Sequence, residues 1–327
     1  MNKGRIGVGL IGVGRHGLRY AQHIVRDLPT AYLSAVCRQH PEQGFDVPGG
    51  TPVNVYGKAA SLIADSTVDV VIVVTPPICY PEICRLAVQA RKPMLIEKPL
   101  GISAADAHAM AALVREAGVP LMTAQTLRFD NTVQQMKKLQ HDIGRSDRLD
   151  LVSRIETRKT ALDHADGYGK RGALLEIGVH MLDLVRFMTG EEVYEARCTM
   201  DVRPAAGPET SASVRLTTSS GTRCQIEIAR VSTGRVGRAT WWGSQGRLDV
   251  DWAQRQVRLS DGTDTENFEL PPSQTVLATL TAFLQAVTDG SPMPVTGEDG
   301  CRAVEIAEAC YRSAQEGGAP VFLDRRS

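Results

Sequence analysis

The sequence predicts an α/β chain of two domains, a dinucleotide-binding domain over residues 1–126 and a substrate-binding and oligomerisation domain over residues 127–327. The first observation is an apolar run that leads directly into a glycine-rich turn at residues 12–17. The second is the alternation of strands and helices before residue 126, which predicts a Rossmann doubly wound parallel sheet. The third is a series of alternating strands after residue 145, which predicts an α+β domain with a large, mostly antiparallel or mixed open sheet.

The glycine-rich turn follows the order strand, tight turn, helix. Gly12 permits the turn, Gly14 lets the backbone approach a pyrophosphate, and Gly17 lets the helix pack closely on the strand. The free N–H groups and the dipole of the helix start then bind the phosphates. A G-x-G-x-x-G turn alone also fits an ordinary loop, but apolar residues at helical spacing and a β-rich run at 31–37 follow this one. We therefore expect this turn to bind a dinucleotide cofactor.

The remaining elements of the first domain are short and regularly spaced. Residues 68–74 are almost continuously β-branched, as in a strand buried on both faces of a parallel sheet. Prolines after Thr75 end that strand. Further segments are predicted as helices over 81–90 and 104–117 and as strands over 93–97 and 119–125.

The second domain shows the period of two that half-buried strands have. Ala212, Val214 and Leu216 share one face, while the residues between them are polar. Strands are expected over 149–158, 192–203, 211–218, 223–231, 238–242, 247–252 and 256–260, and helices over 274–288 and 298–314. One face of this sheet is expected to be free of helices, which predicts a homodimer or homotetramer through that face.

Composition excludes several classes of protein. Basic and acidic residues balance at 37 each, so no global field attracts nucleic acid or an anionic membrane. No apolar run is long enough to span a bilayer, and the N-terminus enters the first strand without room for a signal peptide. The seven cysteines are scattered without a C-x-x-C pair, which favours reduced thiols in a cytoplasmic protein over disulfides or a zinc site.

Lys98 stands at the carboxyl end of a predicted parallel strand, where such sheets place their ligands. Pro99 follows it and pushes its backbone toward an extended conformation. A surface lysine in a loop is the alternative.

A second polar group lies on a predicted helix after Gly172. At the α-helical period Glu176, His180 and Asp183 fall within an arc of roughly 60°. A carboxylate one turn from an imidazole fixes its tautomer and raises its basicity. The alternatives are a solvated polar stripe and a metal site, and no partner cluster of His or Cys supports the metal.

The end of the second strand indicates the cofactor. An acid at this position accepts the ribose hydroxyls of NAD, but residues 36–40 carry Arg38 and no acid precedes Glu42. A guanidinium suits a 2′-phosphate, so NADP(H) is favoured over NAD(H), with Arg15 as a second contact. A surface arginine after a strand is the alternative.

An ordered set of motifs resembles the Gfo/Idh/MocA family, that of glucose–fructose oxidoreductase and inositol dehydrogenase. The motifs are residues 12–17, 73–76, 96–99, 128–130, 174–183, 243–246 and 296–300. The resemblance implies that Lys98 and His180 are the catalytic pair. Two departures are Glu176, where the family usually has aspartate, and residues 78–81, where a histidine is common.

The motifs, the spacing of the polar residues and the resemblance together give a set of expected site residues. Catalysis is expected from Lys98, His180 and Glu176. Cofactor contacts are expected from Gly12, Gly14, Arg15, His16, Gly17, Arg38, Thr75, Pro76, Glu97 and Lys98, and substrate contacts from Lys98, Arg128, Tyr168, Glu176, His180 and Asp183.

The loop 161–169 has basic flanks and carries Asp163, His164, Asp166 and Tyr168. It suits either an anionic sugar clamp or a solvated loop, and His164 is the second candidate base.

The predicted function is hydride transfer between a nicotinamide and a hydroxyl or keto carbon of a sugar, polyol, inositol or sugar derivative. His180 is the expected general base, and Lys98 stabilises charge on the substrate oxygen. Two alternatives remain: a sugar sensor that binds the cofactor without turnover, and a glycosidase or eliminase that retains its cofactor.

Overall fold

The computed structural model describes residues 4–50, 52–156, 165–201 and 207–324. The chain divides into two compact units. The first contains Met1–Thr126 and Gln274–Cys301, and the second contains Leu127–Ser273 and Arg302–Ser327. Residues 274–301 therefore pack with the first unit, whereas the division expected from the sequence assigns them to the second domain.

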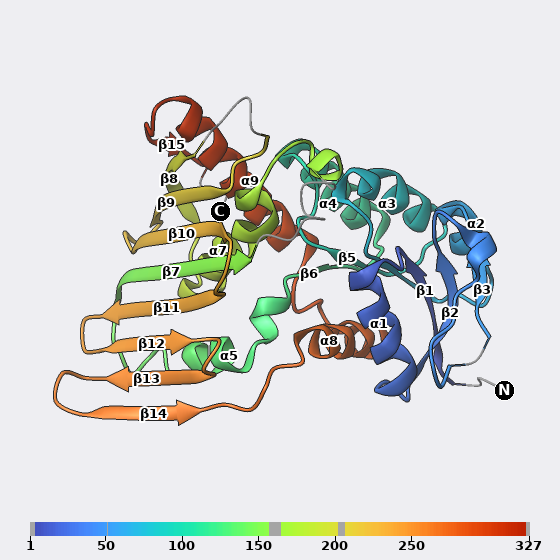
Figure 1. Cartoon of the computed structure of the whole chain (residues 1–327), viewed down its shortest axis with the longest axis horizontal. Helices are drawn as coiled ribbons and strands as arrows, with labels where there is room; N and C mark the ends of the chain where they lie inside the picture. The colour runs from blue at the N-terminus through green and yellow to red at the C-terminus, as the bar shows by residue number, and fades with distance from the viewer. Residues whose placement is uncertain (1–3, 51, 157–164, 202–206, 325–327) are drawn as a thin grey trace. The chain divides into compact units, whose positions relative to one another are not determined.

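The first unit is built on a parallel sheet of six strands in the order β3-β2-β1-β4-β5-β6 (Figure 1). The order reverses between β1 and β4, and ligands of such sheets bind beyond the carboxyl ends of the strands at this reversal. The strands are β1 (Ile6–Ile11), β2 (Ala31–Cys37), β3 (Asn54–Tyr56), β4 (Val70–Val73), β5 (Met94–Glu97) and β6 (Leu121–Ala124). The predicted doubly wound sheet is confirmed.

The helices of the first unit form two groups, which lie on opposite sides of the sheet (Figure 1). Helix α1 packs with α8, while α3 packs with α2 and α4. Ser103 caps the start of helix α4, where its hydroxyl accepts the Asp106 N–H, and Gly118, with a φ of 63°, caps its end. The bounds are α1 (Arg15–Arg26), α2 (Ala59–Ala64), α3 (Tyr80–Gln89), α4 (Ala104–Ala117) and α8 (Thr275–Asp289).

The second unit is built on a mixed sheet of nine strands in the order β14-β13-β12-β11-β7-β10-β9-β8-β15. Strands β7 and β10 are parallel, and the other neighbours run antiparallel. The strands are β7 (Ser146–Glu156), β8 (Val193–Met200), β9 (Ser211–Thr218), β10 (Arg223–Val231), β11 (Val236–Gly243), β12 (Arg247–Asp251), β13 (Gln256–Ser260), β14 (Thr265–Glu269) and β15 (Val321–Phe322).

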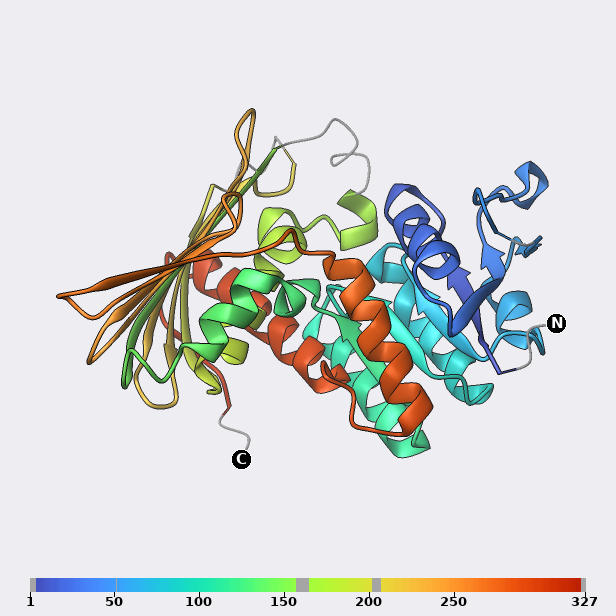
Figure 2. The same ribbon diagram turned by 90° about the horizontal axis from the view of Figure 1, so that it is seen from below.

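One face of this sheet carries the hydrophobic core. Helices α5 (Asn131–Lys138), α7 (Val179–Thr189) and α9 (Gly297–Gln315) lie on that side only (Figure 2). Ala212, Val214 and Leu216 point into the core, whereas Arg215 is exposed. The predicted alternation and the mixed open sheet are confirmed.

Several features differ from the expected elements, and two of them concern β14 and the segment before α7. Strand β14 has a single large apolar side chain, Phe268, so its sequence lacks the alternation that predicts a strand. The helix that carries Glu176 and His180 is not a regular α-helix, because residues Leu174–Gly178 form a π-helical turn before α7 begins. The arc calculated for a regular α-helix therefore does not describe this segment. Within the described part of the chain, no helix is long and apolar enough to cross a membrane.

Candidate active site

The glycine-rich turn between β1 and α1 leaves no room for a Cβ at two of its glycines, but it leaves room at the third. Gly12 has a φ of 92°, and a Cβ there would lie 2.6 Å from the Val74 carbonyl oxygen. A Cβ on Gly17 would overlap the Gly12 carbonyl oxygen. A Cβ on Gly14 would meet no protein atom within 4 Å. The packing thus requires the outer glycines, while space lies over the central one.

The open space adjoins groups of the kind that bind phosphate in other proteins. Helix α1 has Gly14 as its N-cap, without a side-chain hydrogen bond to the N–H groups of its first turn. Arg15 and His16 in that turn are exposed. The Thr75 hydroxyl, beyond β4, is buried and has no hydrogen-bond partner among the described residues. These donors fit the pyrophosphate of a dinucleotide.

Glu97, the last residue of β5, holds a buried carboxylate with several donors. Its Oε1 accepts the Tyr20 hydroxyl at 2.6 Å and lies 2.7 Å from Nε2 of His16. Burial alone raises the pKa of Glu97, but the bond and charge of His16, together with Lys98 and Tyr20, bring that pKa below its usual value. Burial and the Glu97 charge raise the pKa of Tyr20 well above normal. Glu97 is therefore ionised and Tyr20 remains a donor.

Lys98 follows directly, half-buried at the carboxyl end of β5. Its backbone N–H donates to Glu97 Oε2 at 3.1 Å, and the Lys98–Pro99 peptide bond is cis. The backbone from which the lysine side chain extends is thus tied to the same carboxylate that binds His16 and Tyr20.

Arg38 lies immediately after β2, where it anchors a neighbouring loop. Its guanidinium donates to the Gly44 carbonyl and to Gln43 Oε1, both at 2.6 Å. The nearest acid along the chain, Glu42, lies 3.2 Å from His40 Nδ1. Pro76, the other expected cofactor contact, is exposed at the end of β4.

In the second unit the π-helical turn places Glu176 beside an arginine. Glu176 forms an ion pair with Arg230 of β10, whose side chain is only 9% exposed. Burial lowers the pKa of Arg230, and Tyr168 acts on it in the opposite direction. Glu176 and Tyr168 thus belong to one cluster around this guanidinium. His180, half-buried, lies in the first turn of α7.

Asp183 and Arg128, both expected to contact substrate, bind one another. The pair is bidentate, with Nε–Oδ2 and Nη2–Oδ1 distances of 2.8 and 2.6 Å, and both side chains are buried. The Arg128 guanidinium also lies 5.2 Å from the Phe187 ring centroid. This geometry makes the pair a support for α7.

A second buried carboxylate, that of Glu209, fixes the start of the π-helical turn. Its two oxygens accept the N–H groups of Gly172 and Leu174 at 2.9 and 3.1 Å. Its Oε1 also accepts the Tyr311 hydroxyl at 2.7 Å. These bonds hold the backbone that leads into Glu176 and His180.

Asp163 and His164 of the expected clamp loop lie outside the described residues. Tyr168 closes a 3-10 turn at Ala165–Tyr168 and packs against the core. The described residues contain no group of three His, Cys, Asp or Glu side chains that would hold a metal ion.

Sequence reasoning missed Tyr20, Arg230 and Glu209 as members of these networks. Two signals were available. Tyr20 follows His16 by four residues, which places both on one face of α1. Arg230 occupies an inward position of β10 after Cys224, Ile226 and Ile228, and an arginine there requires a buried partner. Glu209 had no comparable signal because its partners are distant in sequence.

Two family models match the chain. An oxidoreductase family with an NAD-binding Rossmann fold matches residues 6–125, and the C-terminal alpha/beta domain of the same oxidoreductases matches residues 164–323. Myo-inositol 2-dehydrogenase of Thermotoga maritima is 29% identical over 94% of this chain and 96% of its own length. D-apiose dehydrogenase of Paraburkholderia graminis is 27% identical over 94% of this chain and 87% of its own.

Among solved structures, a probable dehydrogenase from Thermotoga maritima superposes with a TM-score of 0.83 at 27% identity, covering 97% of this chain and 98% of that one. Its fold and the two family matches agree with the resemblance found in the sequence motifs. The chain belongs to the Gfo/Idh/MocA family of oxidoreductases.

Proposed function

We propose that the protein transfers a hydride between a nicotinamide dinucleotide and the hydroxyl-bearing carbon of a sugar, polyol, inositol or sugar derivative. The observation that carries this proposal is Lys98, tied through Glu97 to the helix that starts at the dinucleotide turn. The names of the inositol and apiose dehydrogenases support the substrate class.

The proposed roles follow from the chemistry of an alcohol. The nicotinamide supplies the hydride chemistry when it is bound. In the oxidation direction His180 takes the hydroxyl proton, which typically contributes ~10²–10⁴-fold to the rate. The Lys98 ammonium donates to the same oxygen and stabilises its developing negative charge. Glu176, paired with Arg230, acts beside His180 on the base or on neighbouring hydroxyls.

We propose NADP(H) as the preferred cofactor. Arg38 is the first charged side chain after β2, and the bonds from its guanidinium to Gly44 and Gln43 fix it at that strand end. Two of the remaining N–H groups of the Arg38 guanidinium suit a bidentate contact with a 2′-phosphate. Arg15 in the first turn of α1 is a second cation for the same group.

We also propose that the chain works in a reducing compartment, the cytoplasm. All seven cysteines lie among the described residues as free thiols, most of them buried. Burial raises the pKa of Cys84 to about 11, which keeps that thiol unreactive.

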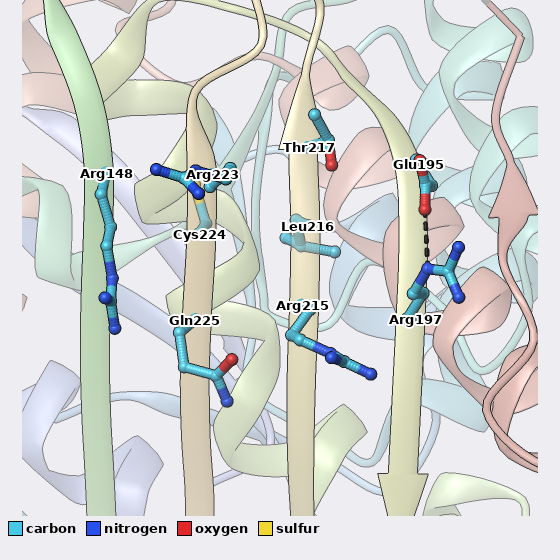
Figure 3. Close-up of a pocket in the computed structure, with 9 residues that line it drawn as sticks. All are labelled: Arg148, Glu195, Arg197, Arg215, Leu216, Thr217, Arg223, Cys224 and Gln225. Atoms are coloured by element: carbon cyan, nitrogen blue, oxygen red, sulfur yellow. Dashed lines mark hydrogen bonds and ion pairs between the residues drawn. The ribbon is translucent and has the colours of Figure 1, made fainter.

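We propose that the chain self-associates, as a dimer or tetramer, through the free face of the nine-stranded sheet. This face has a shallow hollow of about 390 Å³ between β7, β10, β9 and β8, and Figure 3 shows four arginines around it: Arg148, Arg197, Arg215 and Arg223. Arg197 pairs with Glu195 and Arg148 with Asp150, but Arg215 and Arg223 have no acidic partner among the described residues. A second copy would bring acids to these charges and exclude water from the face.

A turnover screen tests the proposed function. NADP⁺ and NAD⁺ are each combined with myo-inositol, D-apiose, aldohexoses and nucleotide sugars, and the absorbance of reduced nicotinamide is followed. Reduction of a cofactor by at least one alcohol is the expected result. A sugar that binds without reduction would indicate a sensor, and a product formed without net cofactor reduction would indicate a cofactor-retaining eliminase or glycosidase. Either outcome would overturn the proposal.

A further inference from the structure

His16, Tyr20 and Glu97 form a network that hydride transfer itself does not use. His16 and Tyr20 lie one turn apart on α1, and their rings meet edge to face with centroids 5.4 Å apart. Both side chains converge on Oε1 of Glu97, which leaves Oε2 for the Lys98 N–H. A buried carboxylate with three donors is fixed in one rotamer, because loss of any donor leaves a charge less well satisfied.

We infer that His16 and Tyr20 are positioning residues, which hold the backbone of Lys98 through Glu97 in register with the start of α1. The inference rests on the proposed role of Lys98. The start of α1, where we expect the dinucleotide phosphates, and the backbone that bears the lysine share one carboxylate. A displacement of either is therefore passed to the other.

The two donors differ in what they contribute. Tyr20 is fully buried, so its only role is within this network. His16 is 44% exposed and stands in the first turn of α1, so a direct contact with a cofactor phosphate is the competing role. The competing role predicts weaker cofactor binding without any change at Lys98.

Helix α1 supplies a matched control. His23 Nδ1 lies 2.7 Å from Asp27 Oδ2, the same distance as in the His16–Glu97 pair, on the same helix. Asp27 is 41% exposed, and the pair makes no contact with Glu97 among the bonds described. His23→Ala therefore removes a histidine–carboxylate bond without touching the network.

The first measurement is amide hydrogen exchange at Lys98 in the protein without cofactor. His16→Ala and Tyr20→Phe should each speed exchange of this N–H on the order of tenfold, because its acceptor is no longer fixed. His16→Gln, whose amide can donate to Glu97, should restore most of the protection. His23→Ala should leave Lys98 unchanged. Amides of β5 and β6 that exchange as in the parent protein show that the fold is intact.

The second measurement compares kcat with cofactor affinity. His16→Ala and Tyr20→Phe should lower kcat about tenfold, while the Kd of the reduced cofactor changes by less than about twofold. Unchanged Lys98 exchange in both variants would overturn the inference. So would weaker cofactor binding with unchanged kcat in His16→Ala, which would make His16 a phosphate contact. If the parent protein turns over no alcohol, the proposed function fails. The exchange measurement still tests whether His16 and Tyr20 position the backbone of Lys98.

Discussion

Three carboxylates of the predicted site, Glu97, Glu176 and Asp183, each bind a specific cation or set of donors. Asp183 pairs with Arg128, Glu176 with Arg230, and Glu97 with His16 and Tyr20. The sequence indicated these residues by type and spacing, but their partners lie up to 81 residues away along the chain. Partners at such separation depend on tertiary packing, which a local pattern does not report.

A substitution in the Asp183–Arg128 pair distinguishes a supporting role of this pair from a contact with substrate. Asp183→Asn should destabilise the second unit by about 3–5 kcal/mol, because it leaves a buried guanidinium without its counter-ion. The midpoint of that unit's thermal transition should fall by roughly 10 °C. Arg85→Leu removes a bidentate but exposed pair with Glu82 and should leave the midpoint unchanged. A raised KM with a normal midpoint in Asp183→Asn would instead indicate substrate binding.

At the residue scale, we predict that Arg38 sets the preference between NADP(H) and NAD(H). Calorimetry should show NADPH binding more tightly than NADH, because the guanidinium meets the 2′-phosphate. Arg38→Asp should reverse the order, since an acid at this strand end accepts the ribose hydroxyls of NAD. Equal affinity of the parent protein for both cofactors would contradict the assignment.

At the scale of elements, the local sequence pattern predicted the strands whose residues are buried on both faces or alternate between the core and solvent. Strands β2, β9, β10 and β13 match their predicted bounds, because continuous apolar runs and strict alternation follow from burial on two faces or one. Strand β14 was missed because its side chains are mostly exposed. The π-helical turn at Leu174–Gly178 was missed because it depends on Glu209 and Arg230, which lie elsewhere in the chain.

The glycine turn gives a paired prediction at this scale. Gly17→Ala should lower the thermal midpoint of the first unit, because the new Cβ overlaps the Gly12 carbonyl oxygen. Gly14→Ala should leave the midpoint unchanged, since its φ is −66° and its Cβ meets no protein atom. The same Gly14→Ala variant should weaken dinucleotide binding at least tenfold by filling the space above the turn. Normal cofactor affinity in Gly14→Ala would show that the pyrophosphate lies elsewhere.

At the scale of the whole molecule, sequence patterns predicted the parallel sheet of the first unit and the mixed sheet of the second. Assembly through the free face of the second sheet stays a prediction. The free face of the nine-stranded sheet carries many polar side chains, and the Trp242 ring on it lies beneath the Arg148 guanidinium at 5.0 Å. Aromatic and arginine side chains are typical anchors of protein interfaces. The face therefore has the composition of a polar interface.

Light scattering tests the assembly. The parent protein at micromolar concentration should have at least twice the chain mass of 35.4 kDa. Trp242→Glu should shift it toward the monomer, because the charge removes an aromatic anchor and repels acids of the opposing copy. Leu18→Glu, which changes an exposed apolar residue of α1, should leave the mass unchanged. A parent protein of 35.4 kDa would contradict the dimer.

The kinetics of Lys98→Met, His180→Ala and the double variant test the central claim most directly. If both residues act on one substrate oxygen, each single change should lower kcat by ~10²-fold or more with little change in cofactor Kd. The double variant should be scarcely slower than either, and loss of His180 should remove the acidic limb of the pH–rate profile. Nearly full kcat in His180→Ala would show that another group, with His164 the next candidate, is the base.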